Sequence, residues 1–134
     1  MNYGLIVTHG KMGKAMKETL ELIVGPVDCI EALSFGQCDG IDELQRSVRK
    51  FIEDRPDDRI FLFTDILGGS CANISLRFLE EERVYLFTGI NLPVLIVFYT
   101  MRKSDPETLC EMLVPQGRDA IVDLKKWAEQ RKKR

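Results

Sequence analysis

The chain of 134 residues is poor in several of the residues that carry common functions. It has a single histidine, His9, and its four cysteines show no C-x-x-C spacing, so we expect reduced thiols, no metal site and no cofactor. The formal charge is −2, from 19 basic and 21 acidic residues. A chain without an excess of either sign has no overall field to attract a polyanion, and we expect no nucleic-acid partner.

Long apolar runs are also missing. No run approaches the roughly 20 residues that a membrane-spanning helix needs, and the N-terminus has no basic segment followed by a signal-type apolar core. We therefore expect a cytoplasmic protein. A hydrophobic content of 45% is enough for one buried core. We expect a single domain over residues 1–124, followed by a basic C-terminal tail, residues 125–134, that is solvated or attracts an acidic partner.

Short apolar runs rich in β-formers alternate with segments of helical periodicity. The predicted strands are residues 3–8, 29–33, 59–64 and 83–88. The predicted helices are residues 11–24, 41–54, one from about 70, residues 91–101, and one that opens at residues 104–107 and ends with Gly117 at its C-terminal cap. Strands that are apolar without strict alternation are typical of a sheet covered on both faces. The sequence therefore predicts an open, doubly wound α/β fold with a mainly parallel sheet.

Polar and glycine-rich residues follow three of these strands. His9 comes at the end of the first strand, in the sequence LIVTHG, and Asp65 comes at the end of the third, in FTDILGGS. The fourth is followed by Gly89 and Asn91. Ligands of open parallel sheets bind beyond the carboxyl ends of the strands, near the point where the strand order reverses. We expect these loops to meet at that edge.

The residue types at this edge fit the transfer of an anionic group. A neutral imidazole is nucleophilic near neutral pH, and a carboxylate such as Asp65 on its other nitrogen would hold the reactive tautomer of His9. Gly68, Gly69 and Ser70 at a helix start would turn backbone N–H groups towards an anion. We interpret the set as a phosphoryl acceptor. The alternative is that His9 is an ordinary loop residue and that the other four form a helix cap and a turn.

Three linked motifs resemble one bacterial family. VTHG, TDILGGSCAN and GINLP, in this order and spacing, are similar to the IIA component of the mannose family of the phosphoenolpyruvate-dependent sugar phosphotransferase system. The resemblance implies that His9 accepts a phosphoryl group from the phosphocarrier HPr and passes it to a IIB domain, and that the membrane components IIC and IID are reached only indirectly. Asp65 would orient the histidine, and Ser70 with its neighbouring amides would contact the phosphoryl group.

The resemblance also implies an assembly. It predicts a homodimer in which an antiparallel edge strand is exchanged between the subunits, and residues 120–124 (AIVDL) match that strand. The chain departs from the family at Cys71, where proline commonly follows G-G-S. A thiol beside an anion-binding helix start suggests a lowered pKa and easy oxidation as a hypothesis.

Three other functions have to be considered. A receiver-type domain phosphorylated on Asp65 would need an acidic pair near the end of the first strand, where the chain has Thr8 and His9. A nucleotide-binding domain would need a G-x-G-x-x-G or P-loop motif, and Gly10 with Gly13 supplies neither. A regulatory module, in which phosphorylation of His9 reports sugar supply without serving transport, has the same acceptor chemistry and stays open.

Overall fold

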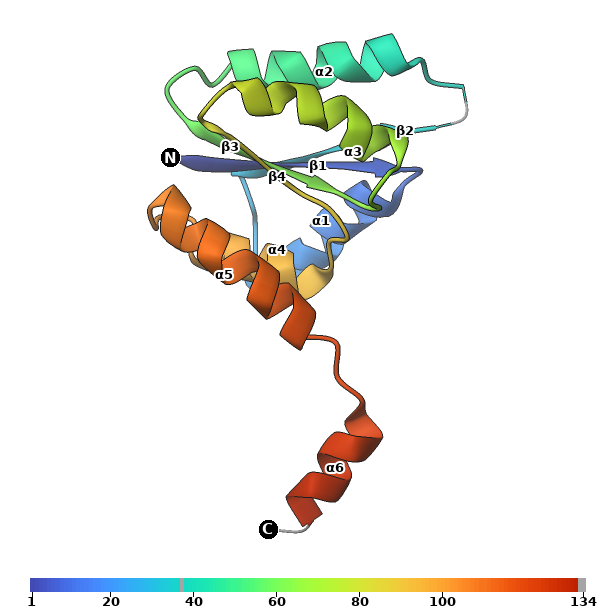
Figure 1. Cartoon of the computed structure of the whole chain (residues 1–134), viewed down its shortest axis with the longest axis vertical. Helices are drawn as coiled ribbons and strands as arrows, with labels where there is room; N and C mark the ends of the chain where they lie inside the picture. Colours follow the sequence, from blue (N-terminus) through green and yellow to red (C-terminus); the bar gives the residue numbers. More distant parts are fainter. Residues whose placement is uncertain (37, 133–134) are drawn as a thin grey trace.

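A computed structural model describes residues 1–36 and 38–132 of the chain. A parallel sheet forms the middle layer, and helices cover both of its faces (Figure 1). The predicted open α/β fold is confirmed. Lys133 and Arg134, which the sequence assigned to the basic tail, lie outside the described residues.

The sheet has four strands in the order β2-β1-β3-β4, and each neighbouring pair is parallel. Their bounds are β1 (Asn2–His9), β2 (Ile30–Phe35), β3 (Arg59–Thr64) and β4 (Val84–Phe87), which confirms all four predicted strands to within two residues. From β1 the chain moves first to β2 on one side and then to β3 on the other side of β1. The strand order therefore reverses between β1 and β3, and their carboxyl ends meet where a ligand crevice is expected.

Within the described residues, six helices and one short 3₁₀ helix complete the fold. They are α1 (Met12–Val24), α2 (Ile41–Glu53), α3 (Ser70–Ser75), which continues into the 3₁₀ helix Leu76–Glu80, α4 (Leu92–Thr100), α5 (Pro106–Asp119) and α6 (Leu124–Lys132). The starts of α4 and α5 are capped as the sequence predicts: the side chains of Asn91 and Asp105 accept hydrogen bonds from the backbone N–H groups of Val94 and Thr108. Gly40 is the N-cap of α2.

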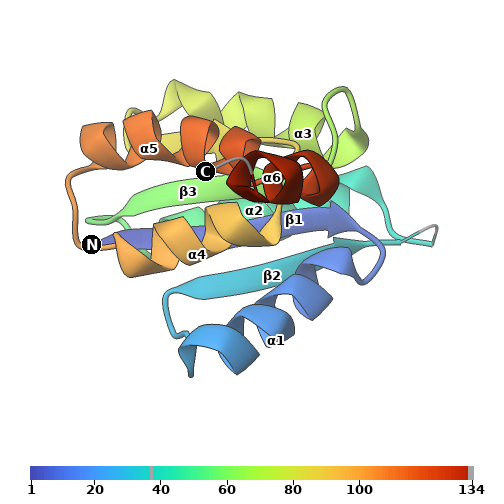
Figure 2. The ribbon, with the colours of Figure 1, turned by 90° about the horizontal axis from the view of Figure 1, so that it is seen from below.

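Two apolar cores hold the three layers together. Helices α2 and α3 lie over one face of the sheet, and α1, α4 and α5 lie on the other side (Figures 1 and 2). Successive residues of β1 alternate between the two cores: Leu5 and Val7 pack beneath α2 and α3, and Ile6 packs with Leu20 of α1. Because both faces are covered, β1 carries a continuous apolar run instead of an alternating one.

Two glycines explain where the predicted helix faces were wrong. Helical spacing alone would place Met12, Ala15 and Ile23 on the inner face of α1, but all three are exposed. The inner face of α1 begins at Gly13, where a Cβ would lie 2.9 Å from Ile6 Cγ2, so the helix approaches the sheet too closely for a larger side chain. Gly117, predicted to cap its helix, lies inside α5 and is buried, because a Cβ there would overlap the Val94 side chain of α4.

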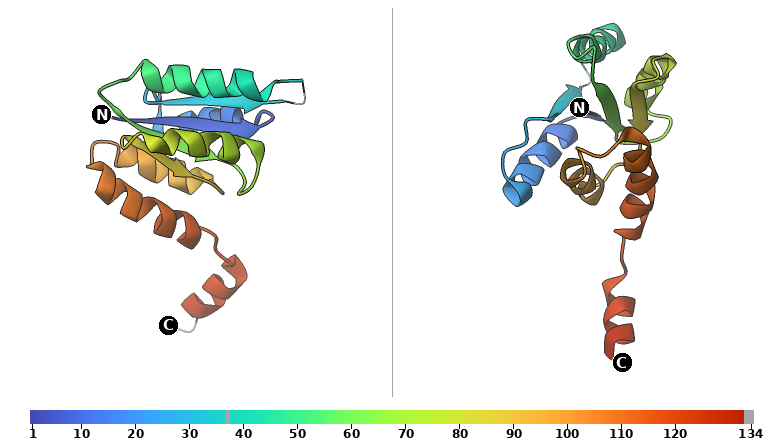
Figure 3. Two further views of the ribbon diagram at one scale, coloured as in Figure 1. Left: turned by 45° about the horizontal axis from the view of Figure 1, so that its top comes forward. Right: turned by 90° about the vertical axis from the view of Figure 1, so that its left-hand side faces the viewer.

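The last described residues form a C-terminal arm, residues 120–132, that extends away from the body (Figures 1 and 3). Residues 120–124 join no sheet in this single chain, although the sequence assigned them to an exchanged strand. Trp127 is about half exposed and contacts Arg131 of its own helix. Among the described residues, no helix has the length and apolar character needed to cross a membrane.

Candidate active site

His9 is the last residue of β1 and lies at the reversal point of the sheet. The chain turns sharply after it because Gly10 has a φ of 58°, a left-handed conformation that favours glycine. The turn is fixed by the Gly10 N–H, which donates to the carbonyl oxygen of Phe35 at the end of β2, with 2.9 Å between N and O.

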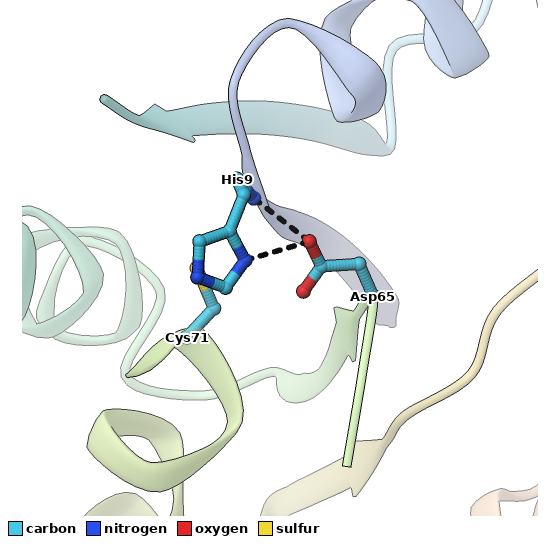
Figure 4. A group of neighbouring side chains, drawn as sticks. All are labelled: His9, Asp65 and Cys71. Carbon is cyan, nitrogen blue, oxygen red and sulfur yellow. Dashed lines mark hydrogen bonds and ion pairs between the residues drawn. The ribbon is translucent and has the colours of Figure 1, made fainter. Parts of the chain in front are cut away.

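Asp65 directly follows β3 and binds His9 twice. Its Oδ2 accepts a hydrogen bond from the His9 backbone N–H at 2.9 Å and lies 2.8 Å from the ring Nδ1 (Figure 4). Its Oδ1 accepts from the backbone N–H of Ile66 at 3.0 Å. The His9 side chain is 45% exposed, whereas that of Asp65 is only 11% exposed. The Asp65 carboxylate thus holds the imidazole on its Nδ1 side, and the rest of the ring is partly open to solvent.

These contacts keep Asp65 ionised. Partial burial raises the pKa of the carboxyl, but the hydrogen bonds from the His9 backbone and ring lower it by more, and the resulting pKa lies below its ordinary value. An ionised carboxylate can only accept a hydrogen bond. Nδ1 of a neutral His9 therefore carries the proton, and the lone pair lies on Nε2.

Two residues that the sequence reasoning missed also position the imidazole. Phe35 packs its ring edge-on against that of His9, with 5.9 Å between the ring centroids and 74° between the planes. Thr8, fully buried, accepts a hydrogen bond through Oγ1 from the backbone N–H of Gly13 at 2.7 Å. This bond ties the start of α1 to the end of β1 and fixes the short loop that follows His9.

The glycine loop after Asp65 lies against the other side of the site. A Cβ on Gly69 would be 3.1 Å from Cε1 of His9, so the loop approaches the ring as closely as a glycine allows. Gly68 has a φ of 81°, and its carbonyl oxygen accepts from Nδ2 of Asn73 at 3.2 Å. The Gly69 N–H is directed to the carbonyl oxygen of Ile66 at 3.2 Å. Of the predicted anion cradle, Gly69 is thus committed to the turn, while Ser70 begins α3.

The third predicted loop does not join the site. The Asn91 side chain is used to cap α4 and to donate to the carbonyl oxygen of Gly117 in α5 at 2.9 Å. The Ile90 N–H donates to the carbonyl oxygen of Thr64 at 3.4 Å. This loop therefore connects the end of β4 to the helices, and its polar groups have structural partners.

Cys71 lies beside His9, but it is not an activated thiol. The side chain is fully buried, and burial together with the negative charge of Asp65 raises its pKa to about 11. The hypothesis of a lowered pKa and easy oxidation is wrong, because the thiol is enclosed below the helix start instead of facing the solvent. The sulfur still belongs to the site: ligand atoms of His9, Asp65 and Cys71 all lie within 4.8 Å of one another (Figure 4).

This arrangement offers one nucleophilic nitrogen with an ionised carboxylate behind it. When Nε2 forms a bond to an electrophile, the ring becomes positively charged, and the Asp65 carboxylate stabilises that charge through Nδ1–H. Phe35 and Gly69 restrict the rotation of the ring. The geometry suits the acceptance of a group by His9 from a partner that approaches the exposed side.

Comparisons with known proteins place this site in a family. Residues 4–112 match the family model described as PTS system fructose IIA component (EIIA-man). The chain is 32% identical, over 74% of its length and 69% of the relative, to the fructose-specific EIIA component of Bacillus subtilis strain 168. It is 25% identical to the mannose-specific EIIAB component of Escherichia coli strain K12, over 90% of this chain but only 39% of that longer protein.

A solved structure shares the fold over nearly the whole chain. The phosphotransferase system component EIIA from Streptococcus agalactiae superposes with a TM-score of 0.87 and 23% identity, over 94% of this chain and 99% of that one. The match to the family model, residues 4–112, includes both His9 and Asp65. The chain belongs to the fructose IIA component family of the phosphotransferase system, the mannose-type IIA components.

Proposed function

We propose that His9 is the phosphoryl acceptor of this IIA component and that Asp65 is its positioning partner. The observation that carries the proposal is the 2.8 Å contact between Nδ1 and Oδ2, which leaves Nε2 as the free nitrogen of a half-exposed ring. The lone pair of Nε2 would form the new N–P bond as the N–P bond to the donor breaks, and the donor nitrogen would keep its electron pair.

Membership of the family supports a proposal for the donor and the acceptor. Within the sugar phosphotransferase system we assign HPr as the donor to His9 and a IIB protein or domain as the next acceptor. The loop of Gly68, Gly69 and Ser70 would lie against the phosphoryl oxygens, with Ser70 at the start of α3 as the polar contact, while the Gly69 N–H stays bonded to Ile66 within the turn. Transport would then reach the membrane components only through IIB, on the cytoplasmic side.

The test uses the full chain with phosphoenolpyruvate, enzyme I and HPr. Intact-mass measurement should find one acid-labile phosphoryl adduct per chain, and His9→Ala should form none. Because the chain has no second histidine, an adduct that survives this substitution would refute the proposal. So would the absence of an adduct on the unsubstituted chain when HPr itself is phosphorylated.

A second step separates transport from regulation. Adding a IIB domain to the phosphorylated chain should remove the adduct from His9 and label the IIB domain. If the adduct forms normally but IIB domains do not accept it, the result favours the regulatory alternative, in which the phosphorylated chain reports sugar supply, over a role in transport.

We also propose a homodimer with an exchanged strand. Within the described residues β4 pairs on one side only, with β3, and the C-terminal arm exposes Ile121, Val122 and Leu124. An unpaired strand edge and an apolar segment without a partner are both unfavourable in water. Residues 120–124 of one subunit would pair antiparallel with β4 of the other. Light scattering should give twice the mass of the chain, and a monomer that carries full phosphoryl-acceptor activity would contradict this arrangement.

A further inference from the structure

The sequence showed no metal-ligand spacing, yet the fold places three ligand types together. The imidazole comes from the end of β1, the carboxylate from the end of β3 and the thiol from the first turn of α3. Ligand atoms of these three residues lie within 4.8 Å of one another. Because the three residues come from separate segments, no local sequence motif indicates a metal site.

We propose that His9 and Cys71 bind a thiophilic divalent cation of the Zn²⁺ class, through Nε2 and Sγ, while Asp65 holds the ring through Nδ1. In Figure 4 the Cys71 side chain lies at the Nε2 side of the ring, away from Asp65. A histidine that binds a metal usually donates its other ring N–H to a carboxylate, and the 2.8 Å contact with Asp65 has this form.

The distances fit with a small adjustment. A zinc ion has bonds of about 2.3 Å to sulfur and about 2.0–2.1 Å to nitrogen, so two ligand atoms on a tetrahedral ion lie roughly 3.6 Å apart. A ring nitrogen of His9 and Sγ of Cys71 lie within 4.8 Å of each other, and rotation of the Cys71 side chain would have to bring Sγ to the zinc spacing. The imidazole is half exposed and offers the route of entry. Solvent would complete the coordination, so we expect weak, reversible binding and not a structural ion.

The ligand types select the metal. A thiolate with an imidazole favours Zn²⁺, Cd²⁺ or Co²⁺ over Mg²⁺ and Ca²⁺, which prefer oxygen. Binding would replace the Cys71 S–H proton, released to solvent, with an S–metal bond. The metal binds the lone pair of Nε2 in the tautomer whose proton is on Nδ1, so no electron is transferred and no bond to the ring is broken.

The bound cation would occupy the nitrogen assigned to the phosphoryl group. Metal binding and phosphorylation of His9 would then exclude each other, and the cation would act as a reversible inhibitor of this IIA component. The exclusion rests on the proposed function, but the binding itself does not.

The binding test uses the full chain with Cys38→Ser, which removes an exposed thiol. Titration with Cd²⁺ should give one equivalent of the ultraviolet sulfur-to-cadmium charge-transfer band. Cys71→Ser should abolish this band, and the matched control Cys110→Ser, at a partly buried cysteine of α5, should keep it. Asp65→Asn, which removes the carboxylate behind the ring, should weaken Cd²⁺ binding by about 10- to 100-fold. His9→Ala removes a ligand itself and should weaken Cd²⁺ binding by more than that.

The outcomes separate the two proposals. A band that survives Cys71→Ser, or that is absent from the parent, overturns the metal site. If Cys71→Ser fails to fold, His9→Ala still tests the site, because the ring that it removes is half exposed and the fold should tolerate its loss. A Cd²⁺ affinity that is unchanged in His9→Ala also overturns the site.

To test whether metal binding excludes phosphorylation, the phosphorylation rate of each variant with Zn²⁺ is compared with its own metal-free rate. Zn²⁺ at a concentration that saturates the parent site should slow the parent at least tenfold and Cys71→Ser little, and equal inhibition of both refutes the exclusion. A Cd²⁺ band on a chain that HPr never phosphorylates would leave the metal site standing and the proposed function refuted.

Discussion

Two regions differ in how well their side chains are partnered within one chain: the site at the carboxyl ends of β1 and β3, and the C-terminal arm. At the edge, His9 has hydrogen bonds from both its backbone N–H and its ring to Asp65, and Phe35 packs against the ring. On the arm, Ile121 and Leu124 are among the most exposed apolar side chains of the described residues, and α6 buries none of its own. The site is therefore formed within one chain, whereas these apolar side chains of the arm pack against little in the described residues.

This difference predicts that phosphoryl transfer and the oligomeric state depend on different residues. If the site is complete within the chain, substitutions there should change phosphoryl transfer without changing the oligomeric state. Substitutions on the arm should do the reverse. The predictions below test each half of this comparison.

The largest effect is expected from Asp65→Asn. An amide can donate to Nδ1 as well as accept, so the ring is no longer held in the tautomer with Nε2 free, and the carboxylate charge that stabilises the phosphorylated ring is lost. We expect phosphorylation by HPr to slow by about 10²- to 10⁴-fold, measured by rapid-quench kinetics, while the mass in solution stays that of the unsubstituted protein.

The matched control is Asp57→Asn, which removes an exposed carboxylate from the turn before β3, at the opposite edge of the sheet. It should leave the phosphorylation rate unchanged. If the two variants phosphorylate at the same rate, Asp65 does not orient His9.

The second effect concerns the arm. A charged residue in place of Ile121 or Val122 should disrupt the proposed dimer, because each apolar side chain contributes about 1.5–3 kcal/mol when buried, which corresponds to about 10- to 100-fold in the dimer dissociation constant. Analytical ultracentrifugation of Ile121→Asp should therefore show a larger monomer fraction at equal concentration.

Leu22→Asp is the control for this effect. Leu22 is 86% exposed on α1, close to the 82% of Ile121, but it lies on the body of the protein. If both substitutions change the mass equally, or neither does, residues 120–124 do not form the dimer contact.

The third effect concerns the turn that holds His9. Thr8→Val keeps the shape of a fully buried side chain but removes the oxygen that accepts from the Gly13 N–H. Leaving a buried N–H without a partner costs about 1–3 kcal/mol, and urea unfolding should show this loss of stability. Thr19→Val, on the exposed side of α1, the helix that contains Gly13, should change the free energy of unfolding by less than about 0.5 kcal/mol. Equal losses in the two variants would mean that the Thr8 hydroxyl does not anchor the turn.

How much of this was predictable depends on the range of each interaction. The strands were predicted because residues such as Leu5, Ile6 and Val7 form one apolar run whose pattern is local. The pairing of His9 with Asp65 was predicted because parallel strands place their carboxyl ends at one edge. These conclusions need only the order of the segments.

Other features depend on how closely segments approach. Phe35 was missed because the predicted second strand ended two residues before it, and the burial of Cys71 depends on the depth at which α3 begins. Gly117 was assigned to a cap, the commoner use of glycine near a helix end, although its missing side chain admits Val94 of α4. None of these distances is encoded in a local pattern.

The smallest effect is a pH dependence of stability that originates at Asp65. Its folded-state pKa lies below the ordinary value of about 3.9, because hydrogen bonds from His9 favour the carboxylate in spite of partial burial. The bonds therefore stabilise the fold above that ordinary value, and the contribution is lost as the pH falls through the lower folded-state pKa. Urea unfolding followed from about pH 5 to about pH 2 should show a smaller loss of stability for Asp65→Asn than for the unsubstituted chain, with Asp57→Asn as the control for the loss of one negative charge. A loss equally steep in Asp65→Asn would mean that the ionised Asp65 adds nothing to folding, and the site would then be held by Phe35, Gly69 and the Thr8 anchor alone.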